Sequence, residues 1–162
     1  MVTHIPKSDG DKHRRIIAEN LLIQKRFPFL NTRMVGTRLV CRGRIQPTEA
    51  SAVYRIEVSY EPWGAPEIRI LEPAIKPETK LHFYKSGNLC LYDWREQPWQ
   101  RRWRLAETII PWTAEWLVFY EIYQLTGIWT GPSAVHGEPK AECPAPEPAE
   151  TETRGEQQER VE

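Results

Sequence analysis

The chain has 162 residues and a formal net charge of zero at pH 7, with 40% hydrophobic and 27% charged residues. This composition is typical of a water-soluble globular protein, and the length suits one ordinary domain. No apolar run approaches the roughly 20 residues that a membrane-spanning helix needs. The N-terminus lacks the apolar core of a secretory signal. Because the three widely spaced cysteines do not suggest a disulfide framework, we expect a cytoplasmic protein.

The neutral total hides a charge asymmetry. Residues 138–162 contain eight Glu against one Lys and two Arg, so this segment carries −5 and residues 1–137 carry about +5. The segment also contains four prolines and no aromatic residue. Such a composition cannot bury enough apolar area to offset chain entropy. The sequence therefore predicts a folded domain over residues 1–137 and a disordered acidic tail over 138–162.

The first predicted element is a helix over residues 9–26. Ser8, Asp9 or Asp11 can cap its start. Phe27-Pro28 ends it, because the residue before a proline avoids the helical region. The face expected to pack against the domain follows helical spacing: Ile16, Ile17, Asn20, Leu21, Ile23 and Gln24.

Strand patterns follow over residues 37–45, 52–60 and 67–71, and Pro- and Gly-containing turns separate them. Short connections favour an antiparallel meander. A loop-rich region over 72–103 leads to a final helix over 106–127. Pro111 suits its first turn and Gly127 suits its stop. The order of elements predicts an α+β fold, with helices against three or four antiparallel strands.

The three cysteines fit neither a disulfide framework nor a zinc site, because they are odd in number and widely spaced. Cys41 lies inside a strand pattern, and Cys143 lies in the acidic tail. Cys90 is the remaining candidate for a thiol nucleophile. The alternative is that Cys90, flanked by leucines, is a small buried hydrophobic residue without chemistry.

The residues around Cys90 favour the chemical interpretation. His82 precedes it by eight residues, with a turn between them that Gly87 and Asn88 allow. Asn88 and Tyr84 supply neutral hydrogen-bond donors that can stabilise an oxyanion. His82 either takes part in the reaction or fixes the loop by bonding to the backbone.

These residues carry a resemblance to a known family. The motif Gly87-Asn88-Leu89-Cys90-Leu91-Tyr92 is followed by Trp94, Trp99 and Trp103, by a tryptophan-rich helix, and by Thr126-Gly127-Ile128-Trp129-Thr130-Gly131. The pattern resembles the active-site region of E2 ubiquitin-conjugating enzymes. It is more similar to the bacterial E2-like proteins of CBASS anti-phage operons, over roughly residues 35–137.

The resemblance implies an E2-like fold: an N-terminal helix, an antiparallel meander, an irregular active-site segment and a C-terminal helix. Cys90 matches the thioester-forming cysteine, and His82 matches a histidine that usually shapes the loop. Phe83 and Tyr84 replace the proline and asparagine that follow this histidine in the family. The oxyanion donor is therefore expected from Tyr84 or Asn88.

The resemblance also implies a function, namely a thioester between Cys90 and the C-terminus of a cGAS/DncV-like nucleotidyltransferase in antiviral defence. The chain has no Gly-rich nucleotide loop for an E1-like activating domain, so we expect a stand-alone E2-like enzyme without metal or cofactor. Two alternatives remain open. One is a cysteine hydrolase that uses Cys90 with His82 or His136, and the other is an inactive E2-like binding module.

The sequence also suggests a partner-binding surface. Trp94 and Trp99 lie in a charged loop, where exposed aromatic side chains can contact a partner. Arg101 and Arg102 follow them and could bind an acidic protein or phosphates. The simpler interpretation of these arginines is a solvated edge, and we expect neither a nucleic-acid nor a membrane partner.

Overall fold

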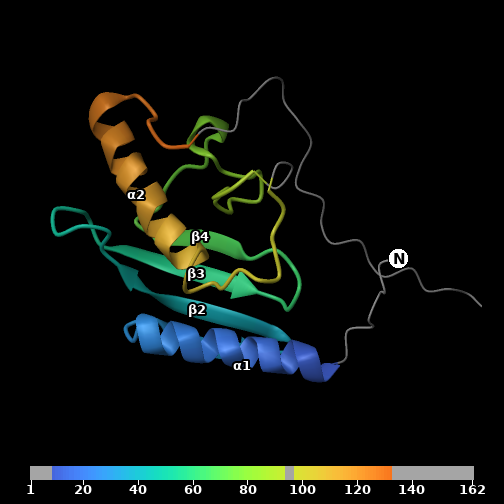
Figure 1. Ribbon diagram of the computed structural model, residues 1–162. Coiled ribbons are helices and arrows are strands. Elements are labelled where there is room, and N and C mark those ends of the chain that lie inside the picture. Colours follow the sequence, from blue (N-terminus) through green and yellow to red (C-terminus); the bar gives the residue numbers. More distant parts are fainter. Residues whose placement is uncertain (1–8, 94–96, 133–162) are drawn as a thin grey trace, which may run out of the picture.

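The computed structural model describes residues 9–93 and 97–132 of the chain (Figure 1). The predicted tail, Cys143, His136 and Trp94 lie outside the described residues. The elements are two long helices, four strands and a 3-10 turn: α1 (Asp9–Arg26), β1 (Asn31–Val35), β2 (Arg38–Ile45), β3 (Tyr54–Tyr60), β4 (Glu67–Glu72), η1 (Thr79–Leu81) and α2 (Ile109–Thr126). The predicted α+β fold is confirmed.

The strands form one antiparallel sheet in the order β1-β2-β3-β4. Strands β2, β3 and β4 correspond to the three predicted runs, whereas β1 was not predicted as a separate strand. Four of its five residues are exposed, so it lacks the alternation that marks a half-buried strand. It forms because Gly36, with φ of 61°, closes a two-residue turn between Val35 and its partner Arg38.

One face of the sheet carries the core. Alternate residues of β3 are buried, and the paired positions of β2 continue the same face. Gly43 interrupts this face for a steric reason. A Cβ atom there would lie 2.5 Å from Leu30 Cδ2 and 3.0 Å from the Phe29 carbonyl oxygen. The missing side chain therefore lets the Phe29–Leu30 turn pack directly on β2.

Both helices contribute to this core. Ile16 and Ile23 of α1 are buried in it together with Ile109 and Leu117 of α2. In Figure 1, α1 runs along the β2 side of the sheet and α2 crosses it obliquely. Neither helix within the described ranges combines the length and apolarity needed to cross a membrane.

The buried face of α1 differs from the predicted one. Ile17 and Leu21 were expected to pack inward, but they are 45% and 59% exposed. Arg15 and Glu19 take inward positions instead and are 7% and 0% exposed. The prediction counted apolar and amide side chains, and it did not foresee that a paired arginine and glutamate could occupy the core side of the helix.

Helix α2 begins at Ile109, three residues later than predicted, and ends as predicted. Pro111 lies in its first turn, where a missing N–H costs nothing. Gly127 adopts the left-handed conformation with φ of 71° and donates its N–H to the Tyr123 carbonyl oxygen at 2.7 Å. This cap directs the chain back towards residues 128–132.

Candidate active site

The segment from His82 to Cys90 forms a small hairpin. The N–H of Cys90 donates to the His82 carbonyl oxygen at 2.7 Å, and the N–H of Tyr84 donates to the Asn88 carbonyl oxygen at 2.9 Å. Phe83 and Leu89 form an antiparallel bridge between these two bonds. Residues eight positions apart in the sequence therefore lie directly across from each other.

The turn of the hairpin depends on Gly87. Its N–H donates to the Tyr84 carbonyl oxygen at 2.9 Å, which closes the turn. Its φ of 81° lies in the left-handed region, where a side chain would be strained. Lys85 and Ser86 at the tip are exposed.

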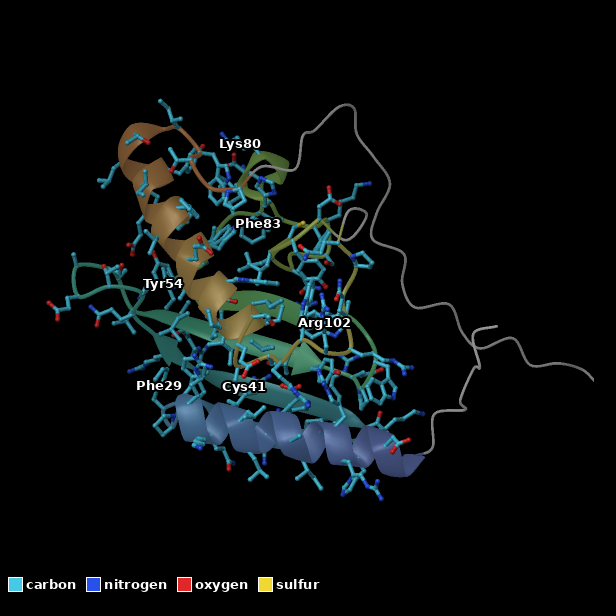
Figure 2. The ribbon with its side chains drawn as sticks, viewed as in Figure 1. Phe29, Cys41, Tyr54, Lys80, Phe83 and Arg102 are labelled. Carbon is cyan, nitrogen blue, oxygen red and sulfur yellow. The ribbon has the colours of Figure 1, made fainter. Side chains whose placement is uncertain are left out.

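The hairpin is fixed to the rest of the domain on two sides. Leu89 donates its N–H to the Ile68 carbonyl oxygen of β4 at 2.8 Å, so the hairpin covers part of this edge of the sheet. On the other side, Trp116 of α2 donates its indole N–H to the Leu81 carbonyl oxygen at 3.2 Å. Phe83, which is labelled in Figure 2, packs edge-on against the same Trp116 ring, with centroids 5.2 Å apart.

Cys90 lies at the end of this hairpin and is a partly exposed residue. Its Sγ donates to the Tyr92 carbonyl oxygen at 3.5 Å. Cys41 offers a contrast, because it is 1% exposed in the core and burial raises the pKa of its thiol from 9.0 to about 12. Of these two cysteines, Cys90 is the more exposed. Burial disfavours the thiolate of Cys41, which is the reactive form of a cysteine.

His82 is a buried residue of the hairpin rather than an open catalytic base. It is 7% exposed, and its ring packs against Trp129 with centroids 5.6 Å apart. Its φ of 57° is left-handed, which is uncommon for a residue with a side chain. This backbone conformation redirects the chain from η1 into the hairpin, so the geometry favours the loop-shaping role.

The two candidate oxyanion donors lie on the hairpin in different settings. Asn88 is 8% exposed, and its Oδ1 accepts a hydrogen bond from Arg69 Nε at 2.8 Å. The amide is therefore oriented by a residue of β4. Tyr84 is partly exposed and lies at the base of the turn.

Two aromatic clusters flank the hairpin. The first contains Tyr92, Trp99, Trp103 and Trp112, with successive ring centroids 5.4 to 6.2 Å apart. The second surrounds Trp116 and contains His82, Phe83, Phe119, Tyr120 and Trp129. Cys90 lies between the two clusters in the sequence, after Phe83 of the second cluster and before Tyr92 of the first.

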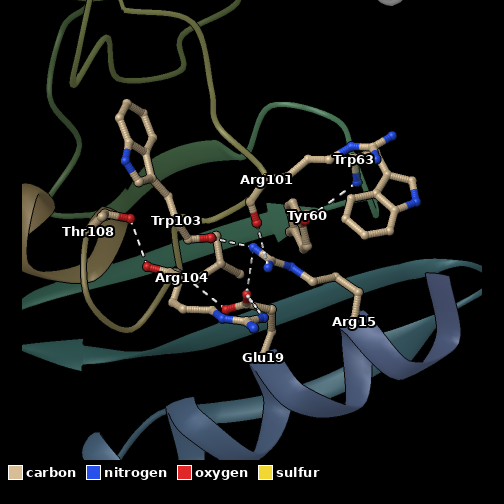
Figure 3. A network of polar contacts seen from close by, with 9 residues as sticks. Arg15, Glu19, Tyr60, Trp63, Arg101, Trp103, Arg104 and Thr108 are labelled. Atoms are coloured by element: carbon tan, nitrogen blue, oxygen red, sulfur yellow. Dashed lines mark hydrogen bonds and ion pairs between the residues drawn. The ribbon is translucent and has the colours of Figure 1, made fainter. Parts of the chain in front are cut away.

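A buried polar network holds the loop of the first cluster against α1 (Figure 3). The Arg15 guanidinium lies 2.9 Å from the Glu19 carboxylate and donates to the carbonyl oxygens of Arg101, at 2.7 Å, and Trp103. Glu19 also accepts the Leu105 N–H at 2.9 Å. The network connects α1 to the loop immediately before α2.

The predicted partner-binding residues fall into different environments. Trp99 is half-buried in the first cluster, which differs from the exposed position expected for it. The charged residues next to Trp99 in the sequence predict an exposed position, because the aromatic rings that cover it lie further away in the sequence. Arg101 and Arg102 are exposed, and the Arg101 guanidinium lies over the Trp63 ring at 4.4 Å.

Two contacts of the site were not anticipated from the sequence. Trp129 was noted only as part of the Thr-Gly-Ile-Trp ending, yet it packs on His82. Arg69 carries no local signal that connects it to Asn88, which lies 19 residues away. In the described parts of the chain, no three His, Cys, Asp or Glu side chains gather as a metal site.

The antiparallel sheet, the two long helices and the partly exposed Cys90 before the second helix agree with the arrangement expected of an E2-like domain. A family model described as Type II CBASS E2 protein matches residues 19–137. The chain belongs to this family. No curated protein matches it.

Proposed function

We propose that Cys90 accepts an acyl group as a thioester from the C-terminus of a partner protein and passes it on. The proposed partner is a cGAS/DncV-like nucleotidyltransferase, and the proposed setting is antiviral defence. The observation that carries the proposal is the hairpin, which combines a partly exposed Cys90 with a backbone fixed by hydrogen bonds to His82 and β4. Membership of the CBASS E2 family supports it.

The chemistry requires an acyl donor that arrives activated, because a free carboxylate and a thiol do not form a thioester spontaneously. The Cys90 thiolate attacks the carbonyl carbon of an acyl adenylate or of another thioester. The C–S bond forms, the bond to the adenylate or thiol leaving group breaks, and the thiol proton passes to solvent. An amine of the target later attacks the thioester and releases the Cys90 thiol.

Tyr84 and Asn88 are the proposed oxyanion donors. The Tyr84 hydroxyl and the Asn88 amide can each donate a hydrogen bond to the developing negative charge. The bond between Arg69 and Asn88 Oδ1 supports Asn88 by fixing the orientation of its amide.

The setting of His82 supports acyl transfer over hydrolysis. A cysteine hydrolase needs a base that can reach the thiol and alternate between acid and base. His82 is 7% exposed and packs on Trp129, which suits a residue that holds the loop. A hydrolase remains the second candidate function, because the hydrogen bond from Cys90 N–H to the His82 carbonyl oxygen keeps the two residues adjacent.

Intact-mass analysis tests the proposal. The full chain is incubated with the nucleotidyltransferase, an E1-like activating enzyme and ATP, and then analysed without reducing agent. We expect the mass to increase by the mass of the partner less one water. Hydroxylamine should remove this adduct. The Cys90→Ala variant should lose the adduct, and Cys90→Ser should form an oxyester with the same mass increase over the unmodified variant.

One control variant and the alternative outcomes make the result specific. The Cys143→Ala variant removes another thiol and should leave the adduct unchanged. An adduct that still forms in Cys90→Ala contradicts the proposal. Turnover of a peptide substrate without a stable adduct favours the hydrolase, and binding without either favours an inactive E2-like module.

A further inference from the structure

The face of the sheet opposite the core carries a shallow groove. Because neighbouring strand residues point to opposite faces, Arg42, Arg44 and Arg55 face away from the buried Cys41, Ile45 and Ile56. The groove is lined by these three arginines together with Phe29, Asn31 and Leu71. Phe29 is 55% exposed, so the groove combines positive charge with accessible apolar surface.

The charges in this groove are not balanced within the described residues. Arg44 and Arg55 are directly opposite each other in the register of β2 and β3. Like charges at directly opposed positions destabilise a sheet. Arg55 pairs with Glu72 at 2.7 Å and Arg42 pairs with Glu57, whereas the Arg44 guanidinium makes no ion pair in the part of the chain that the structure describes.

The same chain contains an acidic segment that suits this groove. Residues 138–162 carry eight Glu and a net charge of −5. The described chain ends at Pro132, and thirty residues can extend to about 100 Å. A domain of this size has a radius of gyration of only about 14 Å, so the segment is long enough to reach any face of it. Its covalent attachment gives it an effective concentration in the millimolar range.

We infer that the acidic segment 138–162 docks in cis on the groove formed by Arg42, Arg44 and Arg55. Its glutamates supply the anionic partner that Arg44 lacks and relieve the repulsion between Arg44 and Arg55. Phe29 and Leu71 contact its apolar side chains. The docking does not depend on thioester formation at Cys90, so it stands or falls separately from the proposed function.

Paramagnetic relaxation in the full chain tests the docking. Cys143 lies inside the acidic segment and provides the attachment point for a nitroxide label. Cys90→Ser removes the competing thiol, and Cys41 stays unlabelled because it is 1% exposed and burial raises its pKa to about 12. We expect the label to cause a loss of amide signal intensity at residues 42–45 and 55–57, relative to the reduced label.

The variants separate docking from chance proximity. Arg44→Gln with Arg55→Gln should abolish the intensity loss, and so should replacement of the eight glutamates of the segment by glutamine. Lys25→Gln with Arg26→Gln removes the same number of charges from the exposed end of α1 and should leave the loss unchanged. In 1 M NaCl, where the screening length is about 3 Å, the loss should also disappear.

Three results would overturn the inference. The first is that the groove residues lose no signal intensity, or that they lose it equally in the variant Arg44→Gln with Arg55→Gln. The second is loss that appears only when labelled and isotope-enriched molecules are mixed, because the occupant is then a second copy. The third is that inorganic pyrophosphate changes the amide signals of the groove residues whereas the label does not. The groove is then a phosphate site.

Discussion

Removing the buried carboxylate of Glu19 should destabilise the domain strongly. In Glu19→Gln, the new amide oxygen can still accept the Leu105 N–H, which lies 2.9 Å from the carboxylate. Arg15, however, loses the anion that lies 2.9 Å away. Breaking a buried ion pair costs about 3–5 kcal/mol, because a charge is left without its partner. Arg15 keeps its two backbone carbonyl acceptors, so we expect the lower end, about 3 kcal/mol.

Urea unfolding followed by circular dichroism measures this loss. With an m value of about 2 kcal/mol/M, the midpoint should fall by about 1.5 M while m stays constant. Glu61→Gln is the matched control, because the Arg38–Glu61 pair has the same 2.9 Å separation but side chains that are 43% and 51% exposed. An exposed pair contributes about 0–1 kcal/mol. Equal losses below 1 kcal/mol in both variants would refute the argument that burial makes the Glu19 network important.

Three further predictions follow from the geometry. Gly43→Ala should lower the free energy of unfolding by about 1–3 kcal/mol in urea titrations, because its Cβ would lie 2.5 Å from Leu30 Cδ2, and an unchanged midpoint would contradict this packing. Burial raises the pKa of Cys41 from 9.0 to about 12, so the native state keeps a proton that the unfolded state loses. Stability should therefore fall between pH 9 and 12 by up to about 1.4 kcal/mol per pH unit, and Cys41→Ala should reduce this slope; an equal slope in both proteins would show that another group causes it. Tyr84→Phe should slow transfer from the Cys90 thioester at least ~10-fold. An unchanged transfer rate would exclude its hydroxyl as the oxyanion donor.

Local patterns in the sequence were sufficient to predict most of the fold. The boundaries of α1 and the three longer strands follow from proline positions and from alternation of apolar residues. The stop of α2 follows from Gly127, which adopts the expected left-handed conformation. Strand β1 could not be recognised in this way, because its pairing with β2 rather than burial stabilises it. The inward face of α1 could not be recognised either, because its charged residues are buried only through partners about 85 residues away.

Some contacts of the candidate site likewise follow from local sequence, and others depend on long-range packing. The turn at Gly87 is encoded locally, and it accounts for the proximity of the His82 and Cys90 backbones. The packing of Trp129 on His82 and the bond from Arg69 to Asn88 join distant segments. These contacts depend on how α2 and β4 pack around the hairpin, so no spacing in the sequence predicts them.

Mapping the adduct by tandem mass spectrometry tests the central proposal most directly. The conjugate formed with the nucleotidyltransferase is digested at mildly acidic pH, where a thioester survives. We predict a peptide containing Cys90 joined through sulfur to the C-terminal residue of the partner. A conjugate joined through a lysine of this chain, or through Cys41 or Cys143, would contradict the assignment of Cys90 as the acyl acceptor.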